Sequence, residues 1–116
     1  MPIKKKRNET AIVKEILDDL HLNYKNECFA WRNNTGGLPT PRGGFMRFGY
    51  TGSSDIFMIP KKAMGRFVGI EVKDGDGKQE PEQKLFQKHI EEMGGEYILV
   101  WTHEECMNEL RTRNLI

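Results

Sequence analysis

Asp55, Glu71 and Lys73 are the residues of this chain whose types and spacing could carry out a reaction. Glu71 and Lys73 fall in a predicted strand, 67–73, where side chains two positions apart share a face. Asp55 starts the predicted strand before it. If the two strands form a hairpin, Asp55 and Glu71 meet at one end, and the carbonyl of Val72 adds a third oxygen. Mg²⁺ or Mn²⁺ prefers hard oxygen ligands of this kind.

Lys73 adds a group that could take part in a reaction at such a metal site. Lys73 could position or deprotonate an attacking water, and it could offset negative charge in the transition state. Together with a metal ion, these groups are suited to phosphodiester hydrolysis. The Glu-x-Lys triplet alone is a weak signal, because an ion pair at a solvated sheet edge has the same sequence. Asp55 in the preceding strand is therefore the residue that favours a metal site over a simple ion pair.

Hydrophobic periodicity and turn residues predict the elements that must position these side chains. A stretch of alternating strands and helices indicates an α/β fold. The 67–73 strand, the following helix and the next strand form a predicted βαβ unit with parallel strands. The apolar side of that helix is predicted to contain Leu85, Phe86, His89, Ile90 and Met93. The predicted strands are 28–32, 55–59, 67–73 and 96–101, and the predicted helices are 11–22, 81–93 and 104–111.

The first predicted helix has Asn8 as its candidate cap and an apolar stripe that includes Ile12, Val13 and Ile16. Glu9 lies three and four residues before Ile12 and Val13, so it falls on the buried side of this helix. An acid in a first turn interacts favourably with the helix dipole, and periodicity alone favours that interpretation. The alternative interpretation is an acid directed into a functional site.

Residues 35–54 contain six glycines and two prolines, a composition that predicts a long loop. Arg42 and Arg47 alternate there with Phe45, Phe48 and Tyr50. Basic and aromatic residues in this arrangement are suited to phosphate contacts and base stacking, although a plain mobile loop has a similar composition. The P-loop pattern G-x-x-x-x-G-K-[ST] is absent, so this is not a nucleotide-binding loop of that type.

With 116 residues, the chain is predicted to be a single domain, 1–116, with a basic tail at 1–7. Residues 1–73 have a net charge of +6 and residues 74–116 a net charge of −5, which favours a polyanionic partner such as DNA. Two cysteines, no apolar stretch of membrane-spanning length and no signal peptide favour an intracellular protein without a membrane span. The predicted phosphate contacts are Lys4, Lys5, Lys6, Arg7, Arg32, Arg42 and Arg47.

An ordered set of short motifs in the chain resembles the virus-type replication–repair nuclease domain (VRR-NUC) of the PD-(D/E)xK nuclease superfamily. The similarity extends over residues 9–101 and departs from the family pattern at Ser54, where a proline often precedes the first acid. The matching pieces are Glu9, Arg32-Asn33-Asn34-Thr35-Gly36, Gly52-Ser53-Ser54-Asp55, Glu71-Val72-Lys73, Gln83, Gly94-Gly95 and the strand to Trp101.

This resemblance implies a restriction-endonuclease-like core, in which a mixed central β-sheet is flanked by α-helices. It implies that Asp55, Glu71 and the Val72 carbonyl bind Mg²⁺ or Mn²⁺, with Glu9 adding to the metal site directly or through water. Lys73 would be the catalytic lysine, and Gln83 would orient water or a phosphate. A short member of this family is also expected to act as a homodimer on branched DNA such as a four-way junction.

Two further functions remain open from the residues. One is a non-catalytic, structure-selective DNA-binding module, and the other is a nickase that acts on plain duplex DNA.

The sequence does not match the calcium-binding and zinc-binding motifs that parts of it resemble. The 74–85 segment lacks the Gly and Glu that an EF-hand loop requires at its sixth and twelfth positions. His103-x-x-Cys106 has no second pair of metal ligands after it.

Overall fold

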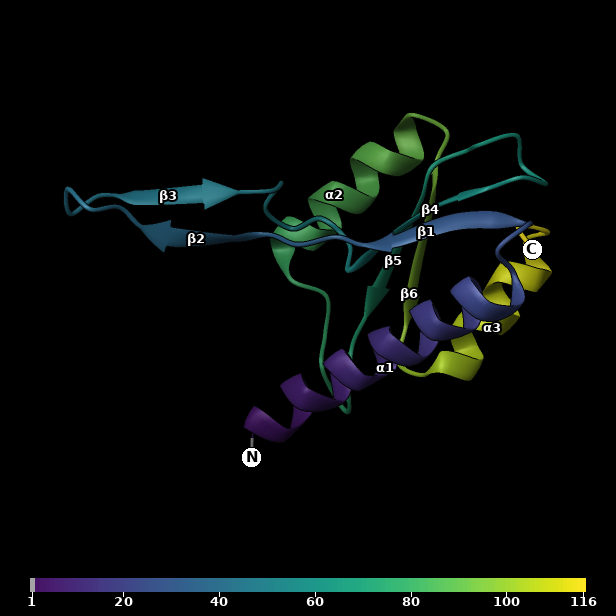
Figure 1. The fold of residues 1–116 in the computed structure, drawn as a ribbon, viewed down its shortest axis with the longest axis horizontal. Helices are drawn as coiled ribbons and strands as arrows, with labels where there is room; N and C mark the ends of the chain where they lie inside the picture. Colours follow the sequence, from purple (N-terminus) through teal and green to yellow (C-terminus); the bar gives the residue numbers. More distant parts are fainter. Residues whose placement is uncertain (1) are drawn as a thin grey trace.

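The structure is a computed structural model that describes residues 2–116, with side chains described from residue 8 onward. In this part of the chain, three helices accompany a four-stranded sheet and a separate two-stranded hairpin (Figure 1). No helix among these residues combines the length and the apolar composition needed to cross a bilayer. The elements are α1 (Pro2–Asn23), β1 (Cys28–Arg32), β2 (Gly36–Pro39), β3 (Phe45–Phe48), β4 (Ile56–Pro60), β5 (Val68–Val72), α2 (Pro81–Glu92), β6 (Glu96–Val100) and α3 (His103–Thr112).

The four-stranded sheet is mixed and has the order β1-β4-β5-β6. β1 pairs with β4, and β4 with β5, in antiparallel fashion. β5 and β6 are parallel and are connected through α2, as the sequence predicts. The predicted α/β class with a mixed sheet and flanking helices is therefore confirmed.

α1 and α3 cover one face of this sheet and form the main apolar core with it (Figure 1). The periodic residues of α1, Val13, Ile16 and Leu20, are all buried there. Alternate residues of β5 point into the same core, so the intervening residues, including Glu71, face the opposite side. The buried apolar residues of β5 therefore determine on which face of the sheet Glu71 lies.

The opposite face of the sheet is covered by α2 and is rich in aromatic residues. Phe57 stacks on Phe86, with ring centroids 6.2 Å apart, and Phe86 also contacts Tyr97. Of the predicted apolar stripe of α2, Phe86 is the one residue that is buried, and Leu85 and Met93 are exposed. This part of the prediction is wrong, because α2 packs mainly on β6 and only a narrow part of its surface meets the sheet.

The first helix is longer than predicted. α1 begins at Pro2, so residues 2–7 are helical and do not form a tail. Proline is favourable at the first position of a helix because its missing N–H would have no helical partner there. Asn8 lies inside the helix and does not cap it, and its Nδ2 lies 3.5 Å from Asp74 Oδ1. The side chains of the basic run Lys4–Arg7 lie outside the described residues.

The predicted loop at 35–54 contains an antiparallel hairpin, which corrects the loop prediction. Gly36 pairs with Phe48 and Pro39 with Phe45. The Phe48 ring lies over Gly36, and the Phe45 ring lies over Gly37, so each aromatic ring covers backbone that a glycine leaves bare. We call residues 36–48 the arm, because this hairpin projects from the body of the molecule (Figure 1).

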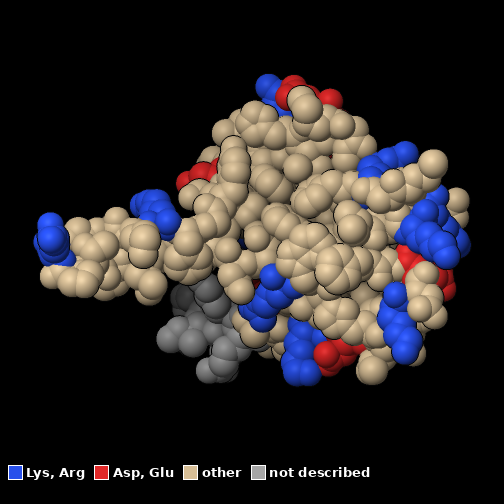
Figure 2. Space-filling model, turned by 45° about the horizontal axis from the view of Figure 1, so that its top comes forward, with Lys and Arg blue, Asp and Glu red and all other residues tan. Residues whose placement is uncertain are grey.

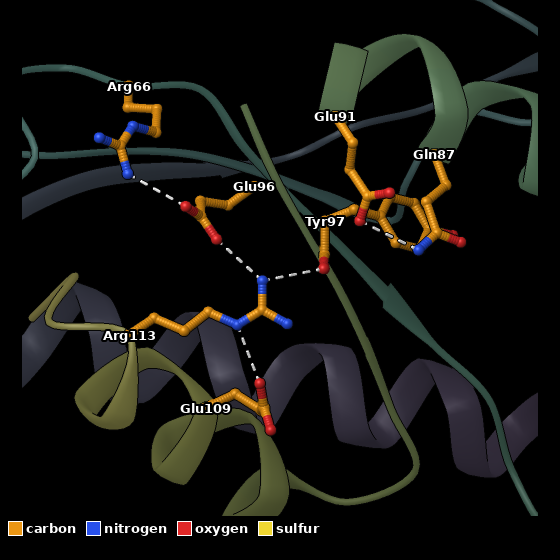
Figure 3. Close-up of polar contacts among 7 residues, drawn as sticks. All are labelled: Arg66, Gln87, Glu91, Glu96, Tyr97, Glu109 and Arg113. Carbon is orange, nitrogen blue, oxygen red and sulfur yellow. Dashed lines mark hydrogen bonds and ion pairs between the residues drawn. The ribbon is translucent and has the colours of Figure 1, made fainter. Parts of the chain in front are cut away.

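A network of charged side chains stabilises the end of the sheet where β6 begins (Figure 3). Arg113 donates to Glu96 and to Glu109, each at 2.9 Å, and to the backbone carbonyl of Tyr97 at 3.2 Å. Arg66 donates to the other oxygen of Glu96 at 3.0 Å. Exposed ion pairs contribute little one by one, but this network joins α3 to the turn before β5. It lies at the opposite end of β5 from Glu71.

Candidate active site

The β4–β5 hairpin brings Asp55 and Glu71 together, as predicted. Ile56 is paired with Ile70, so the preceding Asp55 comes beside Glu71. The backbone N–H of Val72 donates a hydrogen bond of 2.8 Å to Asp55 Oδ2. Because the N–H and C=O of one strand residue lie along the same edge, the Val72 carbonyl is also on the Asp55 side.

Asn33 holds the turn that carries Asp55. Its Nδ2 donates to Ser53 Oγ at 2.7 Å and to the Ser54 carbonyl at 2.9 Å. Its backbone N–H donates to the Asp55 carbonyl at 2.9 Å. The end of β1 is therefore joined by three hydrogen bonds to the segment that positions the first acid. Asn33 belongs to one of the sequence pieces that match the family, but no role is predicted for it from the sequence. The one sequence feature that could have indicated a role is its position directly after a predicted strand.

Glu71 is a buried carboxyl group that lacks part of its expected hydrogen bonding. It is 3 % exposed. Its Oε2 accepts a 2.9 Å hydrogen bond from Gln83 Nε2 and lies 3.8 Å from Lys73 Nζ. Its Oε1 is buried and has no hydrogen-bond partner among the described residues. A buried oxygen without a donor is costly in a folded protein, and a bound cation would satisfy it.

Burial and neighbouring charge also disfavour the ionised form of Glu71. Burial, and then the neighbouring charge of Asp55, raises the pKa of Glu71 to about 9, although Lys73 partly opposes the shift. Burial also raises the pKa of Asp55, against the opposing effects of the Val72 N–H and of Lys73. At neutral pH and without a metal, the Asp55–Glu71 pair therefore retains a proton. A divalent cation would take the place of that proton.

Gln83 joins the start of α2 to the acids. Its Oε1 accepts a 2.8 Å hydrogen bond from the backbone N–H of Glu80, which caps the helix, while its Nε2 donates to Glu71. One amide group thus satisfies a helix end and orients a buried carboxyl group. The resemblance implied a place for Gln83 in the site, and the structure brings it there.

The acids open into a polar pocket of about 590 Å³. Glu9 reaches this pocket from α1, and its charge contributes to the raised pKa of Glu71. Glu9 therefore lies on the side of α1 that borders this pocket. Ten residues line the pocket, six of them predicted site residues: Glu9, Arg32, Asp55, Glu71, Lys73 and Gln83, together with Asn33, Asn34, Thr35 and Glu80.

The structure does not bring all the predicted DNA contacts to this pocket. Arg32 lines it, whereas Arg42 and Arg47 are exposed on the arm. Arg47 lies over the ring of Phe45, with its guanidinium carbon 5.7 Å from the ring centroid. The predicted contacts of the Lys4–Arg7 run involve side chains outside the described residues.

The donor set fits a magnesium-type ion better than a closed metal cage. Among the described residues, no three His, Cys, Asp or Glu side chains form a group that could hold a metal ion. Mg²⁺ is commonly bound by one or two carboxylates, with water and substrate phosphate supplying the other ligands. Asp55, Glu71 and the Val72 carbonyl provide such a partial set, and the bare Oε1 of Glu71 is available to it. Glu9 lines the same pocket and could add to the metal site directly or through water.

Comparison of the chain with protein families, with curated proteins and with solved structures finds no match in any of the three.

Proposed function

We propose that this protein is a divalent-metal-dependent DNA endonuclease with a PD-(D/E)xK core of the VRR-NUC type. One observation carries the proposal. Glu71 is buried, its pKa is raised and one of its oxygens has no partner among the described residues, yet it lies beside Asp55 and Lys73 in an open polar pocket. Such a cluster is costly to the fold, and perturbed acids of this kind concentrate at functional sites.

Asp55, Glu71 and the Val72 carbonyl would hold Mg²⁺ or Mn²⁺. The ion would supply Lewis-acid stabilisation of the phosphate and activation of water. Lys73, whose Nζ lies 3.8 Å from Glu71 Oε2, would orient or deprotonate the attacking water and stabilise the charge of the transition state. Gln83 would keep the Glu71 carboxylate in one orientation.

The surroundings of the pocket support a nucleic acid as the substrate. Arg32 lines the pocket, and the segment that continues from it, residues 33–54, contains two arginines and no acid. The sequence contains no pattern typical of a base-reading helix, so we expect recognition of DNA shape. The resemblance to VRR-NUC adds the proposal that the substrate is branched and that the protein acts as a homodimer, whose two-fold symmetry would suit paired cuts.

The test is a cleavage assay with Mg²⁺ or Mn²⁺ on a labelled four-way junction, compared with linear duplex and single-stranded DNA, with an EDTA control. Glu71→Gln and Lys73→Met should reduce cleavage at least about a hundredfold, while a gel-shift assay should still detect binding. The matched controls are Glu92→Gln and Lys88→Met, which change exposed charges on α2 and should leave the rate unchanged.

The outcomes separate the candidate functions. Paired cuts on the junction alone would support a structure-specific dimer, and single cuts in linear duplex would identify a nickase. Tight binding without cleavage by either metal would identify a non-catalytic, structure-selective DNA-binding module. Retained cleavage in both the Glu71 and the Lys73 variants would contradict the proposed site.

A further inference from the structure

The arm is a direct continuation of the candidate active site. Asn33, Asn34 and Thr35 line the pocket, and β2 begins at the next residue, Gly36. The chain returns at Gly49, where an added Cβ would lie 2.7 Å from the Asn34 carbonyl oxygen. Both ends of the arm are thus fixed at the pocket, so a chain-like ligand bound in the pocket would pass beside the base of the arm.

The two faces of the arm differ. Side chains two positions apart share a face, so Phe45 and Arg47 lie on one side, with the guanidinium group over the ring. The other side carries Leu38, Met46 and Phe48, because Leu38 pairs with Met46. Phe45 is 62 % exposed and Phe48 45 %. One face is therefore aromatic and cationic, and the other is entirely apolar.

The charge of the arm favours a polyanion. Arg42 and Arg47 are its only charged residues. Figure 2 likewise shows basic (blue) and no acidic (red) surface along the projecting hairpin. An exposed aromatic ring beside an arginine is suited to single-stranded nucleic acid, where bases stack on the ring and phosphates contact the cation. A paired duplex offers no free base face to such a ring.

We infer that the arm binds unpaired nucleotides a few positions from the cleavage site, with Phe45 stacking on a base and Arg47 contacting the adjacent phosphate. This inference rests on the proposed function in taking DNA as the ligand. Phe45 pairs with Pro39, four residues beyond Thr35, which corresponds to about 13 Å at ~3.3 Å per residue. That distance corresponds to about four nucleotides at ~3.4 Å each. The substrate class is therefore DNA with an unpaired base a few nucleotides from the cut.

The experiment uses the full chain and a duplex that carries one unpaired 2-aminopurine, a fluorescent base, with a fully paired duplex for comparison. Binding is measured with Ca²⁺ in place of Mg²⁺ and separately in EDTA. Phe45→Leu should weaken binding of the bulged DNA about tenfold and abolish the change in 2-aminopurine fluorescence, because leucine cannot stack on a base. Its affinity for the paired duplex should change less than twofold.

Phe48→Leu is the matched control, since each of the two rings covers one glycine but Phe48 lies on the other face. It should bind both DNAs as the parent does, and circular dichroism should show both variants folded. Equal binding of bulged DNA by the parent and Phe45→Leu would overturn the inference. The inference would also be overturned if both variants lost self-association, measured by sedimentation, without any effect on base stacking. The arm would then be a contact between two copies of the chain.

The binding measurement does not depend on cleavage, so the two proposals can fail separately. If the parent binds the bulged DNA but neither Mg²⁺ nor Mn²⁺ supports cleavage, the nuclease proposal falls and the arm inference stands. If the parent binds no DNA even at low salt, both fall.

Discussion

Gln83 Nε2 donates a 2.9 Å hydrogen bond to Glu71 Oε2, and this contact joins the first turn of α2 to the end of β5. The same amide accepts from the backbone N–H of Glu80 at 2.8 Å. The start of the helix and the orientation of the buried acid are thus set by one side chain. The two contacts use different atoms of the amide, so substitutions can separate them.

Gln83→Glu should reduce cleavage about tenfold or more while keeping the contact with Glu80. Glutamate retains an oxygen that accepts from Glu80, but when ionised it cannot donate to Glu71 and it adds a negative charge beside that acid. Gln83→Ala should lose both contacts and also cost about 1 kcal/mol of stability through the lost cap. Cleavage rates and thermal melting of the two variants measure this difference. A parental rate for Gln83→Glu would show that the contact with Glu71 has no part in the reaction.

The raised pKa of Glu71 predicts how the stability of the metal-free protein depends on pH. Its pKa is about 9 in the folded chain against an ordinary value of 4.5, so between these values the folded state binds the extra proton. The stability contributed by the protonated acid is complete below pH 4.5 and decreases as the pH rises toward 9, by up to ~1.4 kcal/mol per pH unit. Urea unfolding in EDTA at several pH values measures the slope, and Glu71→Gln should flatten it.

A divalent ion should release the same proton. Titration of Mg²⁺ into weakly buffered protein near pH 7.5 should liberate about one proton per chain, because the ion needs the ionised carboxylate. The Glu71→Gln variant should release none. Proton release of equal size from the parent and the variant would place the metal elsewhere.

DNA affinity should decrease steeply with salt. Each phosphate neutralised on a duplex contributes about 0.9 to the slope of log affinity against log salt, so replacing Arg32, Arg42 or Arg47 by Gln should each lower the slope by about that amount. Removing the charges of the Lys4–Arg7 run should lower it further. Arg111→Gln, on the exposed side of α3, serves as the control. An affinity independent of salt would contradict these contacts.

Gly52→Ala should impair both folding and cleavage. Gly52 has a φ of +86°, and an added Cβ would lie 2.5 Å from the Glu82 carbonyl oxygen at the start of α2. Strain and overlap together should cost about 2–4 kcal/mol and displace the turn that carries Asp55. Gly65→Ala is the matched control, since its φ is +80° but nothing lies within 4 Å. It should cost about 1–2 kcal/mol and leave cleavage by the folded protein unchanged.

The sequence predicted the sheet and the acids well, because both follow from local patterns. Alternating apolar residues identified β5, and the hairpin geometry then required Asp55 to meet Glu71. The parallel pairing of β5 and β6 followed from the helix between them. Helical periodicity also placed Glu9 on the side of α1 that faces the site, although periodicity could not say what lay opposite it.

The errors arose where tertiary contacts decide the structure. The arm was predicted to be a loop because glycine and proline are poor strand formers, and nothing in the local pattern showed that Phe45 and Phe48 would cover two of the glycines. The exposure of Leu85 and Met93 depends on how α2 crosses the sheet. The role of Asn33 depends on a turn twenty residues away in the sequence.

The meeting of the two ends of the arm at Asn34 and Gly49 makes the arm a self-contained module. Its length can change without altering the distance that the chain must span at the body, because an antiparallel hairpin grows or shortens at its tip. Evolution or protein engineering can therefore exchange one hairpin for another while Asp55 and Glu71 keep their positions. In the proposed nuclease, substrate choice and phosphodiester chemistry would be encoded in adjacent but separable stretches of the sequence.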